Sequence, residues 1–220
     1  NVKSLSRFFK TGKGEYGEGD KFLGISVPDQ RKVVKQHYAT LPLDPDLKEL
    51  LQSEYHEHRL TALLILVEKF SRSKEDKDRE EYYQFYLDHM QYINNWDLVD
   101  TSAPKIVGAW LINKPKEERT ILYDLAKSND LWEKRISILS TQHFIKQREY
   151  DDTIAIAKIL LHDKHDLIHK AVGWMLREIG NKNLSVEEQF LDEFYTEMPR
   201  TMLRYAIEKF TPQKKKHYMK

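Results

Sequence analysis

The chain has 220 residues, and its 36 Lys and Arg against 35 Asp and Glu give a formal net charge of +1. No cysteine is present, which excludes disulfides, thiolate metal ligands and cysteine nucleophiles. Hydrophobic residues make up 40% of the chain, but the longest apolar run, residues 62–67, is far shorter than the ~20 residues that cross a bilayer. We therefore expect no membrane partner, and residues 1–10 show no secretory signal, so we expect a cytoplasmic location. Because the charges balance, any basic surface for nucleic acid must be assembled locally by the fold.

A glycine-rich stretch occupies residues 12–19 and contains GKGEYG, a literal G-x-G-x-x-G. This motif binds a pyrophosphate when it follows a strand, opens a helix and keeps negative charge away. No strand is predicted before it, and Glu15, Glu18 and Asp20 would repel phosphates. We therefore predict that residues 1–20 form an N-terminal segment with a flexible connector, and we reject a nucleotide site.

Helical periodicity dominates the rest of the chain. Ser26-Val27-Pro28 predicts a helix capped by Ser26, and Asp44-Pro45 predicts another with proline at its first position. Apolar residues within 60–67 recur at i, i+3, i+4 and i+7, as on one face of a helix. Further helix starts are expected at Pro115, at Pro199 and at the capping box formed by Ser185 and Glu188. No alternating strands or hairpin turns are evident, so the chain is predicted to be all-α.

One segment in the middle of the chain contains the strongest candidate for chemistry. Asn94 or Asn95 can cap a helix there, and Asp97 in its first turn would complement the helix dipole. Helical spacing predicts a buried stripe formed by Val99, Ala103, Ile106 and Trp110. Trp96 and Asp100 lie side by side at the edge of this stripe. A carboxylate in that position is costly unless something cationic meets it.

Pro104 falls within the same helix. It has no N–H, and its ring crowds the carbonyl group of Asp100, four residues back. We expect a kink or break there, and hypothesise that it turns Asp100 and Trp96 toward a groove. The alternative is that Asp100 is an exposed surface acid and Trp96 a core residue.

Several helices begin with a basic residue followed by apolar ones, at Arg59, Arg135 and Lys170. The last two are 35 residues apart and the first two 76, close to two such periods. A period of ~35–40 residues is typical of an α-solenoid of HEAT-like helical repeats, whose concave face binds partners. We predict one such domain over residues 1–220, with a generic helical bundle as the alternative, and a solvated basic C-terminal tail over residues 211–220.

Two further tryptophans each precede an arginine by three residues, which places each pair on one helix face: Trp132 with Arg135 and Trp174 with Arg177. Core packing would explain one or two of the tryptophans. Their repeat-like spacing suggests instead an aromatic and ionic surface on the concave side.

The nine histidines raise the question of a metal. They are densest at His56 and His58 and at His162 and His165. Neither group has the H-E-x-x-H spacing, and two ligands are too few for zinc. We expect surface histidines, no metal site and no cofactor.

Taken together, these segments resemble the AlkD-type DNA alkylation repair glycosylases, which are HEAT-like repeat proteins. The resemblance runs from about residue 7 to about residue 210 and is carried by the following sequences: FLGI (22–25) with Pro28 and Arg31, WDLVD (96–100), APKIVG (103–108), LWEKR (131–135), KAVGWMLRE (170–178) and PRTMLRYA (199–206). The order of the motifs is that of the family. The glycine-rich stretch differs from the best-known members, and Tyr16 within it is the candidate for an N-terminal DNA contact.

The resemblance implies a solenoid that holds double-stranded DNA in a concave cationic groove and acts in base excision repair, without flipping the damaged base into a pocket. It implies hydrolysis of the N-glycosidic bond of cationic N3- or N7-alkylated purines such as 3-methyladenine and 7-methylguanine. The family's aspartate maps onto Asp100, its sugar-contacting tryptophans onto Trp96 and Trp174, and its active-site arginine onto Arg135. The family is understood to act as a monomer.

These residue types suit that reaction. A cationic purine leaves as a neutral base, so no general acid is needed, while positive charge develops on the sugar. Asp100 can stabilise this oxocarbenium and position water, and the two indole faces add roughly 0.5–2 kcal/mol each. Arg135 would contact a backbone phosphate or hold Asp100. Lys170 and Arg177 are further candidates for phosphate contact.

The alternative is a non-catalytic helical-repeat scaffold that binds DNA, including branched DNA, or a protein partner. It predicts no base release. It also predicts that Trp96 and Trp174 are deeply buried and far from Asp100.

Overall fold

The computed structural model describes residues 2–219. Every regular element among these residues is a helix, and the bridge between Lys21 and Tyr55 is isolated. The all-α prediction is thereby confirmed. No helix within residues 2–219 combines the length and the apolar character that a membrane span requires. The chain divides into two compact units, Asn1–Trp110 and Leu111–Lys220. The two terminal residues of the predicted domain, 1 and 220, lie outside the described residues.

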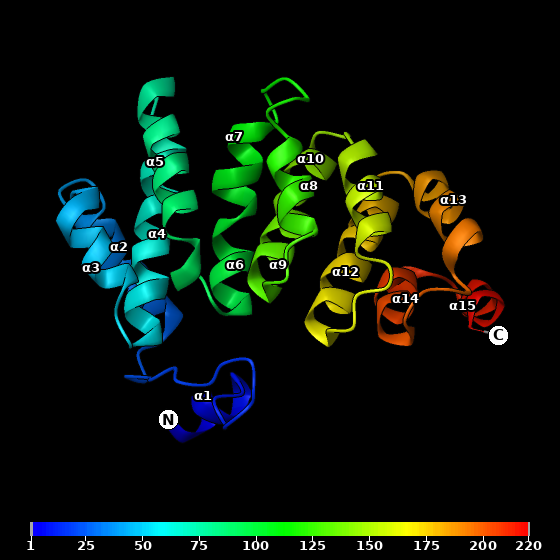
Figure 1. Ribbon diagram of the computed structural model, residues 1–220, viewed down its shortest axis with the longest axis horizontal. Coiled ribbons are helices and arrows are strands. Elements are labelled where there is room, and N and C mark those ends of the chain that lie inside the picture. Colours follow the sequence, from blue (N-terminus) through cyan, green and yellow to red (C-terminus); the bar gives the residue numbers. More distant parts are fainter. Residues whose placement is uncertain (1, 220) are drawn as a thin grey trace. The chain divides into compact units, whose positions relative to one another are not determined.

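Unit 1 is organised around the long helix α4 (Figure 1), which packs against α2, α3, α5 and α6. Its elements are α1 (Val2–Phe8), α2 (Val27–His37), η1 (Leu43–Leu47), α3 (Lys48–Leu51), α4 (His56–Arg72), α5 (Asp76–Asp88), η2 (Met90–Tyr92), α6 (Trp96–Ser102) and η3 (Pro104–Gly108), followed by α7 (Ala109–Leu111) at the boundary. The core of this unit lies along the buried apolar face of α4. The same helix begins at His56, so it positions both the core and the charged cluster described below.

Unit 2 is organised around α12, which packs against α9, α10, α11, α13 and α14. Its remaining elements complete the unit: α8 (Thr120–Ala126), α9 (Leu131–Ser140), α10 (Gln142–Lys146), α11 (Asp151–Ile159), α12 (Asp166–Lys182), α13 (Leu184–Phe194), α14 (Arg200–Ala206), η4 (Ile207–Lys209) and α15 (Pro212–Tyr218). Within each unit, helices that follow one another in the chain pack as neighbours, for example α4 with α5, α8 with α9, and α12 with α13. This is the arrangement of a helical-repeat solenoid.

Several helix starts lie where the sequence predicts them. Ser26 caps α2, because its side-chain oxygen accepts the N–H of Asp29 at 3.3 Å. Asp44 is extended (φ −118°, ψ 127°), and helical dihedrals begin at Pro45. Pro199 immediately precedes α14. Caps and prolines act locally, which is why sequence alone identifies them.

Other helix starts are predicted incorrectly. Helices α4, α9 and α12 begin at His56, Leu131 and Asp166, three or four residues before the predicted starts at Arg59, Arg135 and Lys170. α13 begins at Leu184, with the extended Asn183 before it, so Ser185 lies inside the helix and is not its cap. Pro115 opens a series of turns, and α8 begins only at Thr120.

The predicted solvated C-terminal tail is instead largely the helix α15. Thr211 caps it by accepting the N–H of Lys214. Tyr218 is buried, and its hydroxyl donates to Asp192 at 2.8 Å. A buried aromatic residue within the basic run therefore holds this segment against unit 2, and residue 220 lies beyond the described part of the chain.

Candidate functional site

Helix α6 carries Trp96 and Asp100, one turn apart. Asn95 caps the helix, because its side-chain oxygen accepts the N–H of Trp96 at 2.8 Å. The predicted apolar stripe is confirmed, since Val99, Ala103, Ile106 and Trp110 are all buried. Trp96 and Asp100 are both half-buried. Trp96 is therefore not the deeply buried core residue, and Asp100 is not the fully exposed surface acid, that the alternative interpretation predicts.

Pro104 widens the helix where a kink or break is predicted. The N–H of Gly108 bonds to the carbonyl of Ala103, five residues back, at 3.0 Å. The turn from Pro104 to Gly108 is therefore a π-type turn, which accommodates a residue without an N–H. That this feature turns Asp100 and Trp96 toward a groove stays a prediction.

A buried cluster of charges lies next to the first turn of α6. His56, at the first position of α4, is 1% exposed, so the expectation of a surface histidine is wrong for this residue. Its Nδ1 lies 3.0 Å from Asp20 and its Nε2 lies 2.8 Å from Asp97. Asp20 also accepts hydrogen bonds from Arg59 at 2.5 Å and from Asn95 at 3.1 Å. The connector, α4 and α6 are thus tied together through these side chains.

The protonation states of this cluster follow from its contacts. Burial lowers the pKa of His56, but the hydrogen bonds to Asp20 and Asp97 and their charges outweigh burial and raise it to about 9. Burial raises the pKa of Asp20, but His56, Arg59 and Asn95 outweigh it and hold that pKa below its ordinary value. His56 is therefore an imidazolium at neutral pH, with both ring nitrogens donating. Two cations and two carboxylates balance one another in the interior of unit 1.

Aromatic rings extend from this cluster to Trp96. The rings of His56, Phe9 and Phe22 form one cluster, in which the His56 centroid lies 4.7 Å from Phe9 and 4.9 Å from Phe22 and the two phenyl rings stack at 5.2 Å. Phe9 in turn stacks on Trp96 at 5.4 Å with an interplanar angle of 18°. Phe8 contacts the same indole edge-on at 5.7 Å. One face of Trp96 is therefore covered by Phe9, and the indole is held in a fixed orientation.

The glycine-rich connector has a structural role that differs from phosphate binding. Glu15 accepts the N–H of Gly12 at 2.9 Å, and Glu18 accepts that of Gly14 at 2.7 Å, so these carboxylates take the donors that a phosphate would need. A Cβ on Gly17 would collide with the carbonyl oxygen of Phe9. Glycine at this position therefore lets the connector pack against the end of α1.

The FLGI sequence of residues 22–25 is fixed by a buried carboxylate. Glu57, 3% exposed, accepts the N–H groups of Leu23, Gly24 and Ile25 at 3.0, 2.8 and 3.3 Å. Gly24 has φ +85°, a conformation that glycine adopts without strain. This segment, with its buried Phe22, is thus fixed to the start of α4.

Asp100 faces a different environment from Asp97. It lies close enough to Tyr86 for its negative charge to add to the effect of burial, and both raise the pKa of that phenol. Tyr86 is fully buried and accepts a hydrogen bond from Ser102 at 3.2 Å. A neutral, buried phenol beside Asp100 makes the local surroundings of this carboxylate less polar than water.

In unit 2, the predicted site residues lie on α9 and α12. Arg135 is 4% exposed, and its guanidinium donates to the carbonyl of Leu167, in the first turn of α12, at 2.6 Å. Trp174 is half-buried, and its indole N–H donates to Glu178 at 3.1 Å. Arg135 is therefore joined to the helix that carries Trp174.

The remaining residues that the sequence predicts to contact DNA differ in their partners and in their burial. Lys170 forms an ion pair with Asp166 at 2.6 Å, and Arg177 forms one with Glu208. Tyr16 is half-buried within the connector. Trp132, predicted to lie on a binding surface, is only 8% exposed and belongs to the core.

The sequence gives no sign of a metal site, and the residues around His56 behave as an ion cluster. Within residues 2–219, no group of three or more His, Asp and Glu is placed to hold a metal ion. What sequence reasoning missed is His56 with Asp20 and Asp97, which are separated from it by 36 and 41 residues. The available signals were a polar residue, His56, at the start of α4 and an acidic residue, Asp20, at the end of the connector.

Residues 1–210 match the model of the DNA alkylation repair enzyme family. The chain belongs to this family. Among solved structures it is similar to a predicted DNA alkylation repair enzyme from Enterococcus faecalis, with a TM-score of 0.74 and 17% sequence identity, over 96% of this chain and 95% of that one. Comparison with curated protein sequences gives no match. The family places the chain in DNA repair, and the structural likeness shows the fold.

Proposed function

We propose that this family member is a DNA glycosylase that removes N3- and N7-alkylated purines, such as 3-methyladenine and 7-methylguanine, from duplex DNA. The observation that carries the proposal is the half-buried carboxylate of Asp100, one turn from Trp96, on a helix fixed at its start by a buried ion cluster. The hydrolysis needs one preorganised carboxylate and no general acid, because the alkylated base is already cationic.

Asp100 would act on the sugar. As the N-glycosidic bond breaks, positive charge develops at C1′ and O4′, and a carboxylate in surroundings of low polarity stabilises it strongly. The same carboxylate would orient water for attack on C1′ and accept its proton. The products are the neutral alkylpurine and an abasic site.

Trp96 would contact the sugar with its indole face. That face carries negative charge density, which favours the cationic sugar by roughly 0.5–2 kcal/mol. The stacking of Phe9 fixes the ring before the substrate arrives, so little rotamer freedom is lost on binding. Trp96 assists the carboxylate and does not replace it.

In unit 2, Trp174 would make a similar contact, and Arg135, Lys170 and Arg177 would bind DNA. For Arg135, the burial and the hydrogen bond to Leu167 favour a second role in orienting α12. Lys170 and Arg177 would exchange their carboxylate partners for phosphates, which gives a salt-dependent contribution to binding. We propose that the protein acts as a monomer.

The decisive experiment compares wild type with Asp100→Asn on duplex DNA that contains 7-methylguanine. Wild type should release the base, whereas the variant should lose release by at least about 100-fold, because a neutral amide cannot stabilise the cation. Its affinity for the same duplex should remain, since the proposal places Asp100 at the sugar and not at a phosphate.

The matched control is Asp76→Asn, which removes the same charge from an exposed position at the start of α5. This variant should release base as wild type does. If wild type binds the duplex but releases no base, the protein is a non-catalytic DNA-binding scaffold. If Asp100→Asn retains full activity, the proposed mechanism is wrong.

A further inference from the structure

Phe8 is the most exposed of the large apolar side chains, at 62%. It belongs to an ordered array of rings, because it contacts Phe9 at 5.1 Å and Trp96 at 5.7 Å, edge-on in both cases. A phenylalanine left in water beside a half-buried indole is unfavourable in the free protein. It becomes favourable when a flat apolar surface covers it.

The backbone holds Phe8 in place. α1 ends in a Schellman motif, in which the N–H of Thr11 bonds to Ser6 at 3.1 Å and that of Lys10 to Arg7 at 3.4 Å. Lys10 takes the left-handed conformation (φ 56°) that this motif requires. Phe8 therefore occupies the last turn of a closed helix end, so little order has to be created when a ligand stacks on it.

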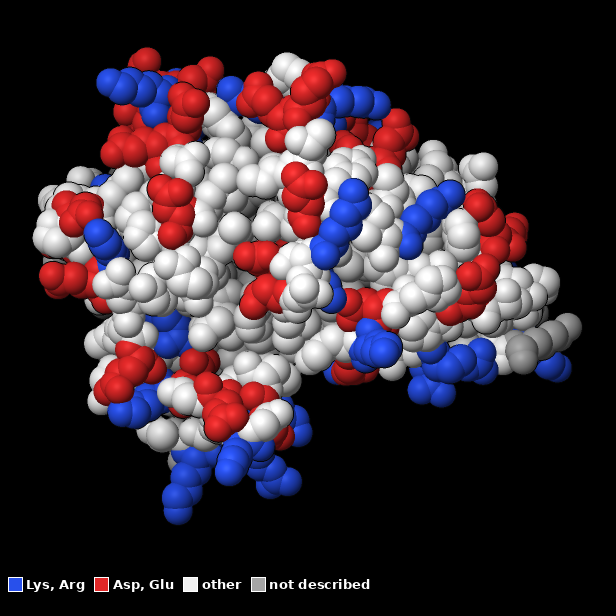
Figure 2. Space-filling view, in the orientation of Figure 1, with Lys and Arg blue, Asp and Glu red and all other residues white. Residues whose placement is uncertain are grey.

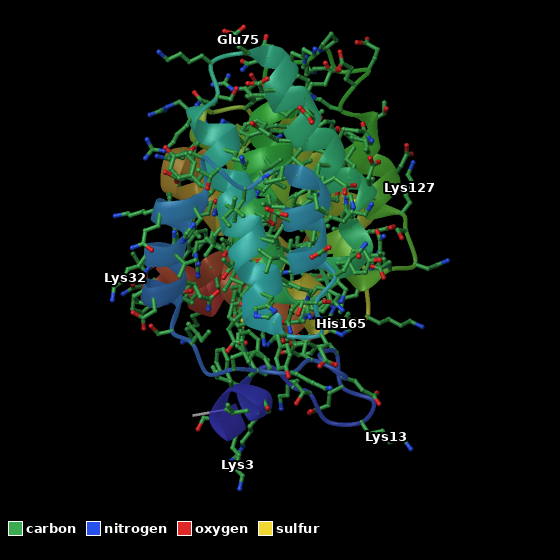
Figure 3. The ribbon with its side chains drawn as sticks, turned by 90° about the vertical axis from the view of Figure 1, so that its left-hand side faces the viewer. Lys3, Lys13, Lys32, Glu75, Lys127 and His165 are labelled. Carbon is green, nitrogen blue, oxygen red and sulfur yellow. The ribbon has the colours of Figure 1, made fainter. Side chains whose placement is uncertain are left out.

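The charge around Phe8 indicates which class of ligand would cover it. Residues 1–14 contain four basic residues and no acidic one, in a chain whose formal charge is only +1. Lys10 is paired with the exposed Glu15 at 3.8 Å and would exchange this partner for a phosphate. The four basic residues are all exposed: Lys3, Arg7, Lys10 and Lys13. Figure 3 shows Lys3 and Lys13 pointing away from the body of unit 1, and Figure 2 shows Lys and Arg projecting at the lower edge of the part that carries α1, with Asp and Glu side chains above them. Cations around an exposed ring match a nucleic acid, which offers phosphates and flat bases together.

We infer that Phe8 stacks on a nucleobase of the bound duplex, adjacent to the nucleotide that Trp96 contacts, while the basic residues of α1 and the connector bind the flanking phosphates. The assignment to DNA rests on the family, and the adjacency to Trp96 rests on the proposed function. Apolar side chains of this kind unstack a base step and hold it open. Such stacking is tolerant of sequence, because every base has an aromatic face.

The test uses a fluorescently labelled duplex with a single tetrahydrofuran abasic-site analogue, whose binding is measured by fluorescence anisotropy. This probe requires no chemistry. Phe8→Ala should weaken binding by about tenfold, the usual loss when one stacking ring is removed. Phe8→Leu should weaken it similarly, because it keeps the apolar side chain but lacks the ring. Phe8→Tyr should bind as wild type.

Two controls separate stacking from other effects. Val33→Ala removes an apolar side chain that is 45% exposed on α2 of the same unit, and it should not change binding. The salt dependence of Phe8→Ala should keep the wild-type slope, whereas Lys13→Ala should reduce the slope by about one, as expected for a lost phosphate contact. Thermal unfolding should be unchanged in Phe8→Ala, because an exposed ring contributes little to the core.

The inference is overturned if Phe8→Leu binds as tightly as wild type, if Val33→Ala weakens binding as much as Phe8→Ala, or if Phe8 variants change self-association and leave DNA binding intact. Base release by wild type is assayed separately. If no base is released but binding still requires the Phe8 ring, the glycosylase proposal fails and the stacking inference stands. If base is released and Phe8 variants bind normally, only the stacking inference fails.

Discussion

Helix α6 of unit 1 begins on a buried cluster of charges, whereas α12 of unit 2 is held by close apolar packing. Asp97, in the first turn of α6, bonds to the His56 imidazolium. On α12, by contrast, a Cβ on Gly173 would collide with the carbonyl oxygen of Met202, so this helix lies directly against α14. The position of α6 should therefore depend on protonation, while that of α12 should depend on shape. The predictions below test this difference in order of decreasing effect.

The largest effect is expected for His56→Ala. Removing the imidazolium leaves Asp20 and Asp97 buried without their main partner, which should lower the free energy of unfolding by about 3–5 kcal/mol. Hydrogen exchange measured on peptides of α6 should accelerate more than on peptides of α12. The matched control is His162→Ala in unit 2, whose exposed side chain should contribute within about 0.5 kcal/mol.

The pH dependence of this loss gives a sharper test. The folded-state pKa of His56, about 9, lies above its ordinary value of 6.5. Its contribution to stability, about 3 kcal/mol by this shift, is therefore complete below pH 6.5 and is lost as the pH rises through 9. The difference between wild type and His56→Ala should shrink between pH 6.5 and pH 9–10 in denaturant titrations. A constant difference across this range would show that His56 is not charged in the folded protein.

Unit 2 contains a buried acidic side chain, Glu187, whose ionisation is unfavourable in the folded protein. This side chain is 2% exposed, and its Oε1 is without a hydrogen-bond partner among the described residues. Burial, reinforced by Glu188, raises its pKa from 4.5 to about 8. The folded protein thus retains a proton that the unfolded chain releases, so wild type loses stability as the pH rises from 4.5 to 8.

Glu187→Gln should remove this loss. The variant should match wild type near pH 4 and be more stable by roughly 2–4 kcal/mol above pH 8, measured by denaturant unfolding at both values. Glu193→Gln, at an exposed position on the same helix, is the control and should show no such pH dependence. Equal effects of Glu187→Gln at pH 4 and pH 8 would contradict the assignment.

The smallest effect is expected for Arg148→Gly. Arg148 has φ 64° and follows α10 in a Schellman motif, with Arg148 N–H bonded to Ile145 and Glu149 N–H bonded to Phe144. Glycine adopts this conformation without the strain of a side chain, so the variant should be more stable by about 0.5–1 kcal/mol. A thermal melt should show a small rise in Tm, and a fall would mean that the Arg148 side chain contributes more than its backbone strain costs.

Local features of the structure could be read from the sequence, and long-range polar contacts could not. The cap at Asn95 and the apolar stripe of α6 depend on residues within one or two turns of one another, so their spacing predicts them. Trp96 and Asp100 emerge at the edge of that stripe for the same reason. The interpretation of Asp97 was incomplete. Its position in the first turn of a helix already explained the carboxylate, and the sequence does not show that His56, 41 residues away, is its partner.

The glycine-rich connector illustrates the same limit. Its acidic residues argued against a nucleotide site, and two of them, Glu15 and Glu18, accept backbone N–H groups of the connector itself. Its close packing through Gly17 against Phe9 could not be predicted, because it depends on where α1 ends. Likewise, Tyr218 makes a folded helix out of a lysine-rich run that composition alone marks as solvated.

The stack of Phe9 on Trp96 makes this tryptophan a one-sided platform. A sugar that rests on the indole would have to approach the face opposite Phe9, because Phe9 covers the other face. The two faces of the indole are therefore not equivalent. On the proposed function, the buried Phe9 would thereby set the side from which a strand approaches Trp96.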